Sequence, residues 1–395
     1  MSLDASAPRQ PRSLLNNARV RGLALQAVLL LILAAFFYDL ALNTMDNMAT
    51  RHIVSGFGFL WRRAGFEVSF SLIPYSGEDN YARALMVGFF NTLLVSAIGI
   101  VLATVLGLVI GLMRLSRNWL ASRMAAAYIE TMRNVPLLLQ LFIWYRLVLS
   151  PLPQARDAIT IGSASLSNKG LTLPAPQFGP GAWMAWAGLL AAVVLSVFIL
   201  RWGRRQQEAT GKKPPTDLLA ALLYVAFPVL FFSAAGWPVS FDHPVRSNFG
   251  FSGGMTLVPE FMALLLALSI YTAAFIAEAV RAGIAAVSKG QSEAATALGL
   301  KPGLAMRLVV LPQALRVIIP PLTSQYLNLT KNSSLAVAIG YPDLVSTGGT
   351  ILGQTGQAIE VVLIWMVIYL TLNLLTSGFM NWFNARNRLG GEVMA

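Results

Sequence analysis

The sequence contains no cysteine and only two histidines among its 395 residues. Without cysteine, disulfide bonds and thiolate chemistry are excluded. A metal site built on histidine needs several ligands at defined spacings, and neither His52 nor His243 has such a spacing. We therefore expect no metal site.

Charged residues are also scarce, at 12% of the chain, where a soluble domain has about 25%. Hydrophobic residues make up 56%, and the mean hydropathy is +0.64. This composition predicts many helices in lipid rather than one aqueous core. The net charge of +12 invites a nucleic-acid partner. Its basic residues cluster in short loops between apolar runs, however, so we expect a lipid membrane and no nucleic acid.

Eight stretches are long and apolar enough to cross a bilayer, for which about 20 residues suffice. We expect Pro320 and Pro321 to interrupt the seventh. The predicted fold class is thus all-α, a polytopic integral membrane protein with about eight transmembrane helices. The expected spans are about 22–42, 86–113, 122–149, 182–200, 218–237, 257–285, 313–340 and 357–383.

Lysine and arginine alternate between the connections of these spans. One set of connections holds 18 of them and the other set holds 7. Loops rich in basic residues stay on the cytoplasmic side, so both termini are predicted to be cytoplasmic. The rich set comprises the N-terminus, the loops 114–123, 201–216 and 281–307, and the C-terminal tail.

The phosphate-binding pattern G-x-x-x-x-G-K-[ST] is missing as well. The nearest Gly-Lys pair, Gly211-Lys212, is followed by Lys213 in a charged loop. We therefore expect this chain neither to bind nor to hydrolyse ATP, to need no cofactor of its own, and not to be an enzyme.

The connection between the sixth and seventh spans has an unusual sequence for a loop. Helix formers fill Glu293 to Leu298, and Gly299 can end a helix. Ser292 can act as its N-cap, and Glu293 then complements the helix dipole. Small alanines suit close docking into a groove on another protein. On these features alone, an amphipathic connector at the membrane interface is an equal alternative.

The same connection resembles the EAA loop of ABC import permeases. The match is complete apart from Val309, where the family usually has Ile. The resemblance implies that this loop is the coupling helix, which docks into an ATP-binding subunit. The matching positions are Glu293, Ala294, Ala295, Gly299, Leu311 and Pro312.

Further segments resemble the polar amino-acid (histidine/glutamine-type) permeases of this family. These segments are Asn91-Thr92-Leu93 and residues 130–140, 274–284, 289–291 and 312–316. The likeness covers about 84–150 and 257–385 and implies a type I importer core of five helices. The long insertion and the first loop, at 55–60, resemble the larger permease of general L-amino-acid transport systems.

These comparisons of residues suggest a domain organisation. An N-terminal segment, 1–85, carries one extra transmembrane helix and a periplasmic loop. The permease domain, 86–384, is interrupted at about 151–256 by an insertion with two extra helices. Residues 385–395 form a cytoplasmic tail.

The resemblance also implies an assembly in the bacterial inner membrane. A dimer of ABC ATP-binding subunits would supply ATP and Mg, and a periplasmic amino-acid-binding protein would deliver L-amino acids. Because the chain has a single EAA loop, a second permease subunit is expected. An ion-coupled secondary transporter is the alternative, and it would need inverted repeats and an ion site. A membrane scaffold without transport is a third class, and it needs no polar face in a span.

Polar residues inside the spans are candidates for a substrate path, because they are costly in lipid. Ser324, Asn328 and Lys331 fall on one helix face, and Ser333 and Ser334 continue the polar stretch. A lysine with amide groups can hold a carboxylate. The equal alternative is that the amide and hydroxyls join helices while Lys331 reaches the outer interface.

Three other candidates lie in the third and sixth spans. Glu278 can hold a substrate ammonium, although a structural pair with Arg281 at i, i+3 is the favoured interpretation. Tyr271 lies deeper in the same span, and Gln140 lies in the span 122–149.

Overall fold

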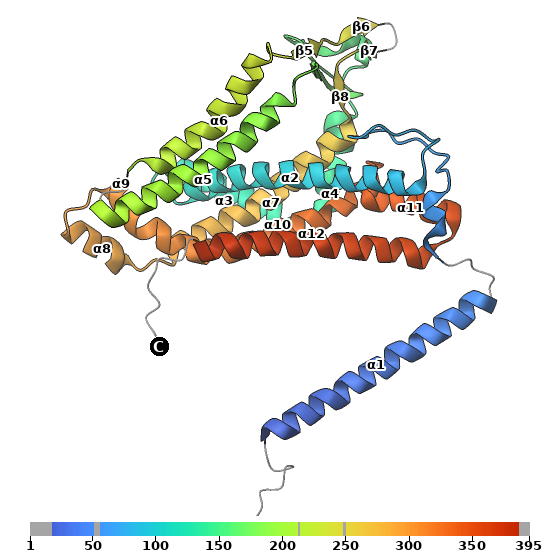
Figure 1. The fold of residues 1–395 in the computed structure, drawn as a ribbon, viewed down its shortest axis with the longest axis horizontal. Coiled ribbons are helices and arrows are strands. Elements are labelled where there is room, and N and C mark those ends of the chain that lie inside the picture. The colour runs from blue at the N-terminus through green and yellow to red at the C-terminus, as the bar shows by residue number, and fades with distance from the viewer. Residues whose placement is uncertain (1–17, 51–55, 212–213, 248–249, 387–395) are drawn as a thin grey trace, which may run out of the picture.

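The computed structural model describes residues 18–50, 56–211, 214–247 and 250–386 (Figure 1). The expected tail, 385–395, falls outside this description from residue 387 onward. Twelve helices occur in the described part. They are α1 Ala18–Thr50, α2 Tyr81–Arg114, α3 Trp119–Asn134, α4 Leu137–Phe142, α5 Met184–Thr210, α6 Thr216–Ala234, α7 Pro259–Ala285, α8 Lys289–Ala297, α9 Pro302–Ala305, α10 Leu311–Asn332, α11 Leu344–Thr355 and α12 Ala358–Arg386.

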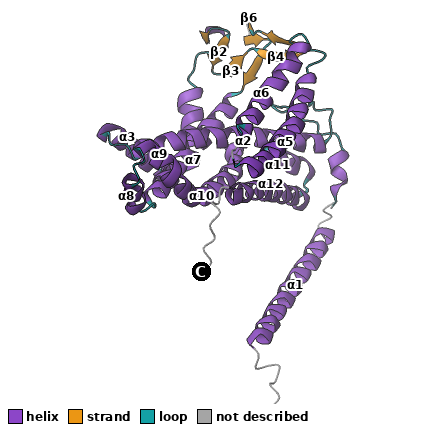
Figure 2. Cartoon of the chain, turned by 60° about the vertical axis from the view of Figure 1, so that its left-hand side comes forward, coloured by secondary structure: helices purple, strands orange, loops and turns teal. Residues whose placement is uncertain are grey.

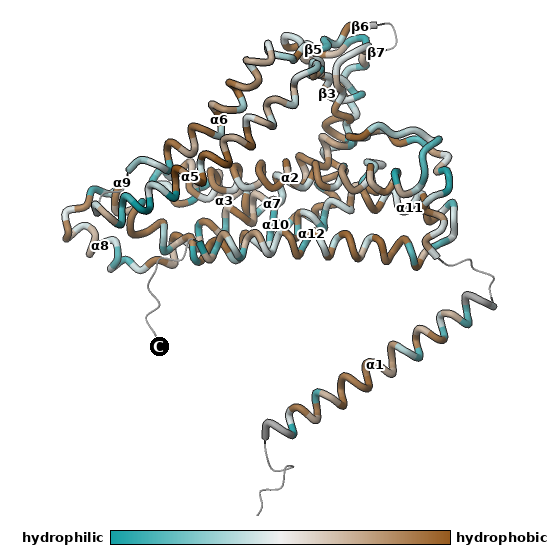
Figure 3. The backbone as a smooth tube through the Cα atoms, viewed as in Figure 1, coloured by the Kyte–Doolittle hydropathy of each residue, from teal (hydrophilic) through white to brown (hydrophobic). Residues whose placement is uncertain are grey.

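The predicted all-α membrane fold is confirmed, because seven candidate spans occur among the described residues. They contain α1, α2, α5, α6, α7, the segment Pro302–Ile339 with α10, and α12. Figure 3 shows hydrophobic residues along the long helices and hydrophilic ones around α8. The helix α11 is an addition, since the sequence predicts only a loop over 341–356.

The third expected span, 122–149, is not one continuous helix but is divided at Pro136, where proline is expected to kink the span or to begin its membrane-embedded portion. Helix α3 ends at Asn134, Val135 is extended, and α4 begins after Pro136. Proline lacks an N–H and pushes the preceding residue out of the helical region, so the chain breaks there. From α4 the chain continues as a π-helical segment, Ile143–Leu149, which leaves a shorter apolar piece, Leu137–Leu149.

Pro320 and Pro321 do not interrupt the seventh span, so that prediction was wrong. Both lie inside the continuous helix α10. They remove two backbone donors, and both side chains are exposed. Helices in membranes tolerate proline where other groups take over the freed carbonyls.

Helices α2 and α7 pack closely in the core through small residues on α2. A Cβ atom added at Gly107 would lie 2.5 Å from Cγ2 of Ile276, and one added at Gly111 would lie 2.8 Å from the carbonyl oxygen of Ala277. Ala103, one turn earlier, is fully buried. Small residues spaced by four let two helix backbones approach, which replaces the hydrophobic driving force that lipid lacks.

Short strands form a cap over the ends of α5, α6 and α7 (Figure 2). The sequence predicts loops over 150–181 and 238–256, so this β-structure is an addition to the prediction. One sheet has the order β1-β2-β3-β8, and the pairs β4-β5 and β6-β7 form two more. The strands are β1 Ile159–Ile161, β2 Ala164–Ser167, β3 Gly170–Leu173, β4 Ala175–Phe178, β5 Val239–Asp242, β6 Val245–Ser247, β7 Gly250–Ser252 and β8 Met255–Leu257.

The insertion also contains a helical hairpin, α5–α6, which we call the arm. Gly188 of α5 lies under Phe227 of α6, where an added Cβ would be 2.7 Å from the carbonyl oxygen. The Ser196 hydroxyl and the Tyr224 hydroxyl are 2.6 Å apart. Figure 1 shows the arm inclined away from α2 and α12, and α1 lying apart from the other helices.

Candidate functional site

The connection between α7 and α10 folds as the sequence predicts, into a short helix, α8, that ends before Gly299. Gly299 has a φ of 76°, which glycine adopts without strain. The predicted start of the helix was wrong. Ser288, not Ser292, occupies the N-cap position, and Ser292 lies within α8.

Most of α8 is exposed. Ala295 alone among its residues is buried, while Glu293 and Ala294 are open to the surroundings. Leu298, which follows the helix, is 81% exposed, the highest value among the large hydrophobic side chains of the described residues. An exposed aliphatic side chain beside a small-residue helix face fits a groove on a partner protein.

A side-chain bridge joins α8 to α10. The Gln313 amide donates to Oε1 of Gln291 at 3.1 Å and to the carbonyl oxygen of Val309 at 3.0 Å. Val309 belongs to a π-helical segment, Met306–Val310, from which Leu311 and Pro312 lead into α10. Single π-turns often occur at functional positions in helices. This bridge links α8 to the start of α10.

The predicted polar face of α10 exists as an open surface. Ser324, Asn328 and Lys331 are all exposed in the single chain. Lys331 and Ser334 line a cavity of about 330 Å³ together with Trp365 and other side chains of α12. A lysine and an amide are costly in lipid, and inside spans such residues usually face a bundle interior or a water-filled cavity.

Two of the sequence candidates do not share that surface. Ser333 is fully buried, and its hydroxyl donates to the Thr330 carbonyl oxygen at 2.7 Å. Gln140 is buried beside α3, where its amide donates to the carbonyl oxygens of Met132 and Val135 at 2.9 and 3.0 Å. These bonds satisfy carbonyls that the end of α3 leaves without intrahelical partners.

The charged residues of α7 form a local pair. Arg281 donates to the Glu278 carboxylate at 2.9 and 2.6 Å. Tyr271 packs against Phe275, with ring centroids 4.9 Å apart. Arg133 of α3 lies over the Phe275 ring, 5.2 Å from its centroid. Glu278 thus has a cation within its own helix.

A buried polar joint between α2, α11 and α12 was missed at the sequence level. Asn91 donates to the carbonyl oxygens of Phe70 and Pro342, each at 2.9 Å. The Leu344 N–H donates to the Thr92 hydroxyl at 3.1 Å, and the Trp365 indole donates to the Leu344 carbonyl oxygen at 3.0 Å. The sequence shows Asn91-Thr92 as a polar pair inside an apolar run, but it does not show which distant segments the pair contacts.

Asp343 lies in this joint, in the connection between α10 and α12, and it is fully buried. Its Oδ1 accepts from the Ser346 N–H at 2.8 Å, which caps α11. Its Oδ2 has no hydrogen-bond partner in the described part of the chain. Burial raises the pKa of the Asp343 carboxyl from 3.8 to about 7, against the opposite effect of the N–H groups that it accepts from.

Comparison with known proteins adds the family. Residues 214–389 match the family "Binding-protein-dependent transport system inner membrane component". The chain is 53% identical, over 96% of its length and 95% of the relative, to the general L-amino acid transport system permease protein AapQ of Rhizobium johnstonii.

Two further relatives have similar coverage. The putative amino-acid ABC transporter permease protein YhdX of Escherichia coli is 49% identical over 94% of this chain and 95% of its own length. The glutamate/glutamine/aspartate/asparagine transport system permease protein BztB of Rhodobacter capsulatus is 43% identical over 95% and 96%. With spans, loop geometry and relatives in agreement, the chain belongs to the inner membrane permeases of amino-acid ABC transporters.

Proposed function

We propose that this chain forms half of the translocation path of an ATP-driven importer for L-amino acids, with no chemistry of its own. A partner dimer of ATP-binding subunits supplies ATP hydrolysis with Mg, a second permease completes the path, and a periplasmic binding protein delivers the substrate. The relatives named for general L-amino acids and for four acidic and amide amino acids support a broad specificity. The membrane is the bacterial inner membrane, with both termini cytoplasmic.

The observation that carries this proposal is the exposed helix α8 and its bridge to α10. The EAA positions Glu293, Ala294 and Gly299 lie on or next to α8, and Leu311 and Pro312 begin α10. An ATPase that holds Leu298 in a groove moves α8, and the Gln291–Gln313 bond passes that movement to the path helix. Energy enters only through the different docking of α8 in two states.

The substrate path in this proposal follows the open face of α10. Lys331 holds the carboxylate of an amino acid, and Asn328 and Ser324 supply hydrogen bonds further along the helix. Tyr271 and Glu278 belong to α7, which packs against α10, and Glu278 is neutralised by Arg281. Ser334 lines the same cavity as Lys331. Ser333 and Gln140 donate hydrogen bonds to backbone carbonyl oxygens and lie outside this path.

The test is purification of the tagged chain from detergent-solubilised membranes, with identification of the proteins that remain bound. We expect an ABC ATPase and a second permease, and ATP-dependent amino-acid uptake in vesicles made with them. Elution of the chain alone, or as a homo-oligomer without an ATPase, overturns the proposal.

A variant of the coupling loop sharpens the test. Gly299→Trp is expected to remove the ATPase, because it adds bulk and strain at the docking helix. Gly162→Trp is the matched control, since Gly162 also has a positive φ of 61° and open space around it, but lies in the strand cap. Equal loss of ATPase from both variants would contradict a docking role for α8.

A further inference from the structure

Exposed tryptophans mark two levels along α5 of the arm. Trp183 and Trp186, at the cap end, are 67% and 73% exposed, and Trp202, near the other end, is 54% exposed. Trp183 and Trp202 are separated by about 28 Å along the helix axis, at 1.5 Å per residue. The hydrocarbon of a bilayer is about 30 Å thick, and tryptophan concentrates at both of its interfaces. The two levels therefore match the two interfaces of a membrane.

The surface of the arm between these levels is suited to lipid chains. Residues 187–200 contain no charged side chain. Only 17% of the most apolar stretch of α5 and 6% of that of α6 is buried within the chain. The polar groups Ser196 and Tyr224 bond to each other between the two helices. Lipid is therefore the surroundings that this part of the arm fits.

Three arginines lie at the second level, beside Trp202. Arg201, Arg204 and Arg205 are all exposed. Between them, Gly203 faces α6, since a Cβ added there would lie 2.5 Å from Cγ2 of Thr216. A helix turns by about 100° per residue, so Arg201 and Arg205 lie on the side of α5 that faces away from α6. Side chains four residues apart on a helix are neighbours, and these two can therefore reach one group together.

This arginine cluster, which consists of Arg201, Arg204 and Arg205, has no acidic partner in the part of the chain that the structure describes. Glu208 is the one acidic residue of α5, and it is exposed and pairs with none of them. Like charges one turn apart repel each other. An anion bound between Arg201 and Arg205 removes this repulsion.

We infer that the arginine cluster binds the headgroup phosphate of an anionic phospholipid. The guanidinium group matches phosphate with two parallel hydrogen bonds, and basic clusters next to the cytoplasmic end of a span attract anionic lipid. The connection 201–216 holds five basic residues, more than any other connection between the expected spans. The headgroup level that Trp202 marks makes a lipid, rather than a soluble anion, the ligand.

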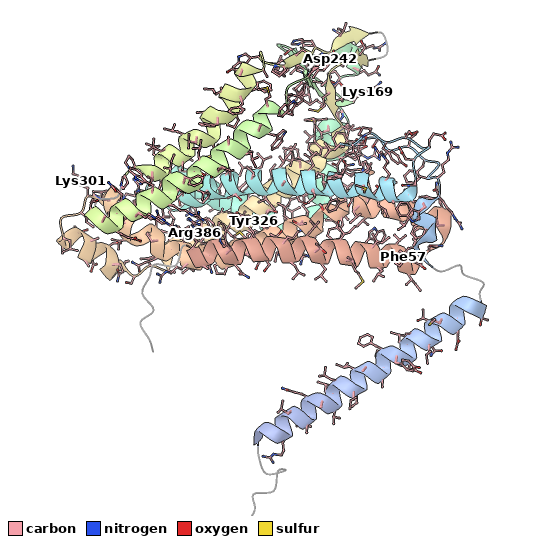
Figure 4. All side chains as sticks on the ribbon, in the orientation of Figure 1. Phe57, Lys169, Asp242, Lys301, Tyr326 and Arg386 are labelled. Atoms are coloured by element: carbon pink, nitrogen blue, oxygen red, sulfur yellow. The ribbon has the colours of Figure 1, made fainter. Side chains whose placement is uncertain are left out.

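The side of the membrane in this inference rests on the proposed function, which places α8 in the cytoplasm. In Figure 4, Lys169 and Asp242 of the cap lie at the far end of the arm from Lys301, which follows α8. Trp183 begins α5 directly after the cap strand β4, so the arginine cluster belongs to the end nearer to α8. The bound lipid is therefore in the cytoplasmic leaflet.

A lipid titration tests the site in the assembled importer. Delipidated importer in detergent is titrated with phosphatidylglycerol, and bound lipid is counted by native mass spectrometry. The double variant Arg201→Gln/Arg205→Gln should bind phosphatidylglycerol on the order of tenfold or more weakly than wild type, because two charges near the headgroup are lost. Binding of phosphatidylcholine, which is neutral, should change little.

The matched control removes the same charge elsewhere. Arg117 and Arg123 are also exposed, and they lie in the basic connection 114–123, outside the arm. Arg117→Gln/Arg123→Gln should bind phosphatidylglycerol as wild type does. Equal weakening in both double variants would show a general effect of positive charge and overturn the inference. Displacement of the lipid by an equal concentration of inorganic phosphate would overturn it too, because the cluster would then be a site for soluble anions.

Photo-cross-linking locates the lipid. Phosphatidylglycerol with a photoreactive group close to its glycerol backbone is added to the wild-type importer, and the labelled peptide is identified. The labelled peptide should contain the end of α5, and the label should be lost in Arg201→Gln/Arg205→Gln. Labelling confined to other helices, or loss of the ATPase instead of the lipid in this variant, would overturn the inference.

The two proposals fail separately. If ATP-driven uptake persists while the arginine cluster shows no preference for phosphatidylglycerol, only the lipid site is refuted. If no ATPase binds to the wild-type chain, the importer is refuted, and the lipid titration can still be made on the purified chain.

Discussion

The core and the arm are built from equally apolar helices, but they bury them differently. In α7, 61% of the most apolar stretch is buried within the chain, compared with 17% in α5 and 6% in α6. Helix α7 is enclosed by α2, α3 and α10, whereas α5 and α6 pack mainly on each other. Hydropathy alone therefore does not distinguish a helix that is buried in the core of the chain from one whose surface is left for lipid or a partner.

The difference lies in small residues and buried polar groups rather than in hydrophobicity. Gly107 and Gly111 bring α2 onto α7, and the joint around Asn91 fixes α11 against α2 and α12. In membranes, where lipid is as apolar as leucine, such contacts supply the specificity of packing. The arm has one close approach of this kind near each end, at Gly188 and at Gly203, which lies under Thr216.

The largest effect expected from this comparison follows from bulk at the core contact. Gly107→Leu should prevent α2 and α7 from packing into the core. The leucine side chain collides with Ile276 and the Ala273 carbonyl oxygen. Overpacking of this kind costs about 1–3 kcal/mol or more. Gly188→Leu makes a similar collision in the arm, and it should leave the core assembled. Size-exclusion profiles in detergent compare the amount of folded protein in the two variants. An equal loss of folded protein in both would contradict the difference between core and arm.

The next largest effect concerns the open face of α10. Lys331→Met should lower amino-acid uptake on the order of tenfold or more, because the carboxylate loses a charged partner. Ser333→Ala should leave uptake near wild type, since that hydroxyl is buried and donates to the Thr330 carbonyl oxygen rather than facing the open surface. Uptake is measured in vesicles with matched protein amounts. Normal uptake by Lys331→Met would show that the lysine does not bind the substrate and instead reaches the outer membrane interface.

A smaller, pH-dependent effect is expected at Asp343. The pKa of its carboxyl is 3.8 when solvated, as in the unfolded chain, and about 7 in the fold, so the folded state binds the extra proton between these values. The stability from this group is complete below about pH 4 and is lost as pH rises through about 7. Thermal midpoints of wild type should therefore fall from about pH 5 to about pH 8.

Asp343→Asn should flatten this dependence, with a gain over wild type at about pH 8 on the order of 1 kcal/mol or more. Parallel pH curves for the two proteins would show that Asp343 is not responsible. Substitutions in the arm should leave the pH dependence of the thermal midpoint unchanged, because the described helices of the arm contain no buried carboxylate.

The smallest effects compare one hydrogen bond from each region. Trp365→Phe removes the donor to the Leu344 carbonyl in the joint, and Tyr224→Phe removes the hydroxyl bound to Ser196 in the arm. Each should cost about 0.5–1.5 kcal/mol locally. Only the first should lower the thermal midpoint of the core, which can be followed by heating in detergent.

Much of this architecture was predictable because long apolar runs and the EAA spacing are strong signals. The helix break lies at Pro136, where a proline predicts a kink even though the apolar pattern of 122–149 continues through it. The strands of the cap escaped prediction for another reason. Each has only 3 or 4 residues, too few for an alternating pattern to stand out from a proline-containing loop.

The candidate site was partly predictable for similar reasons. Periodicity correctly grouped Ser324, Asn328 and Lys331 on one face, because a continuous helix keeps its spacing. Ser333 and Gln140 are buried and bind nearby carbonyls, and a polar residue in an apolar run gives no sign of whether it will face a path or a carbonyl. The Asn91 joint depends on contacts between segments about 250 residues apart, which no local pattern reveals.

The pairing of β4 with β5 has a practical consequence for the arm. Phe178 lies opposite Val239 and Ala175 opposite Asp242, so the chain leaves for the arm and returns from it at neighbouring points. Directly opposed residues in such a pair have Cα atoms only about 4.5–5.5 Å apart. A two-residue turn can therefore replace everything between residues 178 and 239, or a reporter domain can be grafted there, without moving the start of α7.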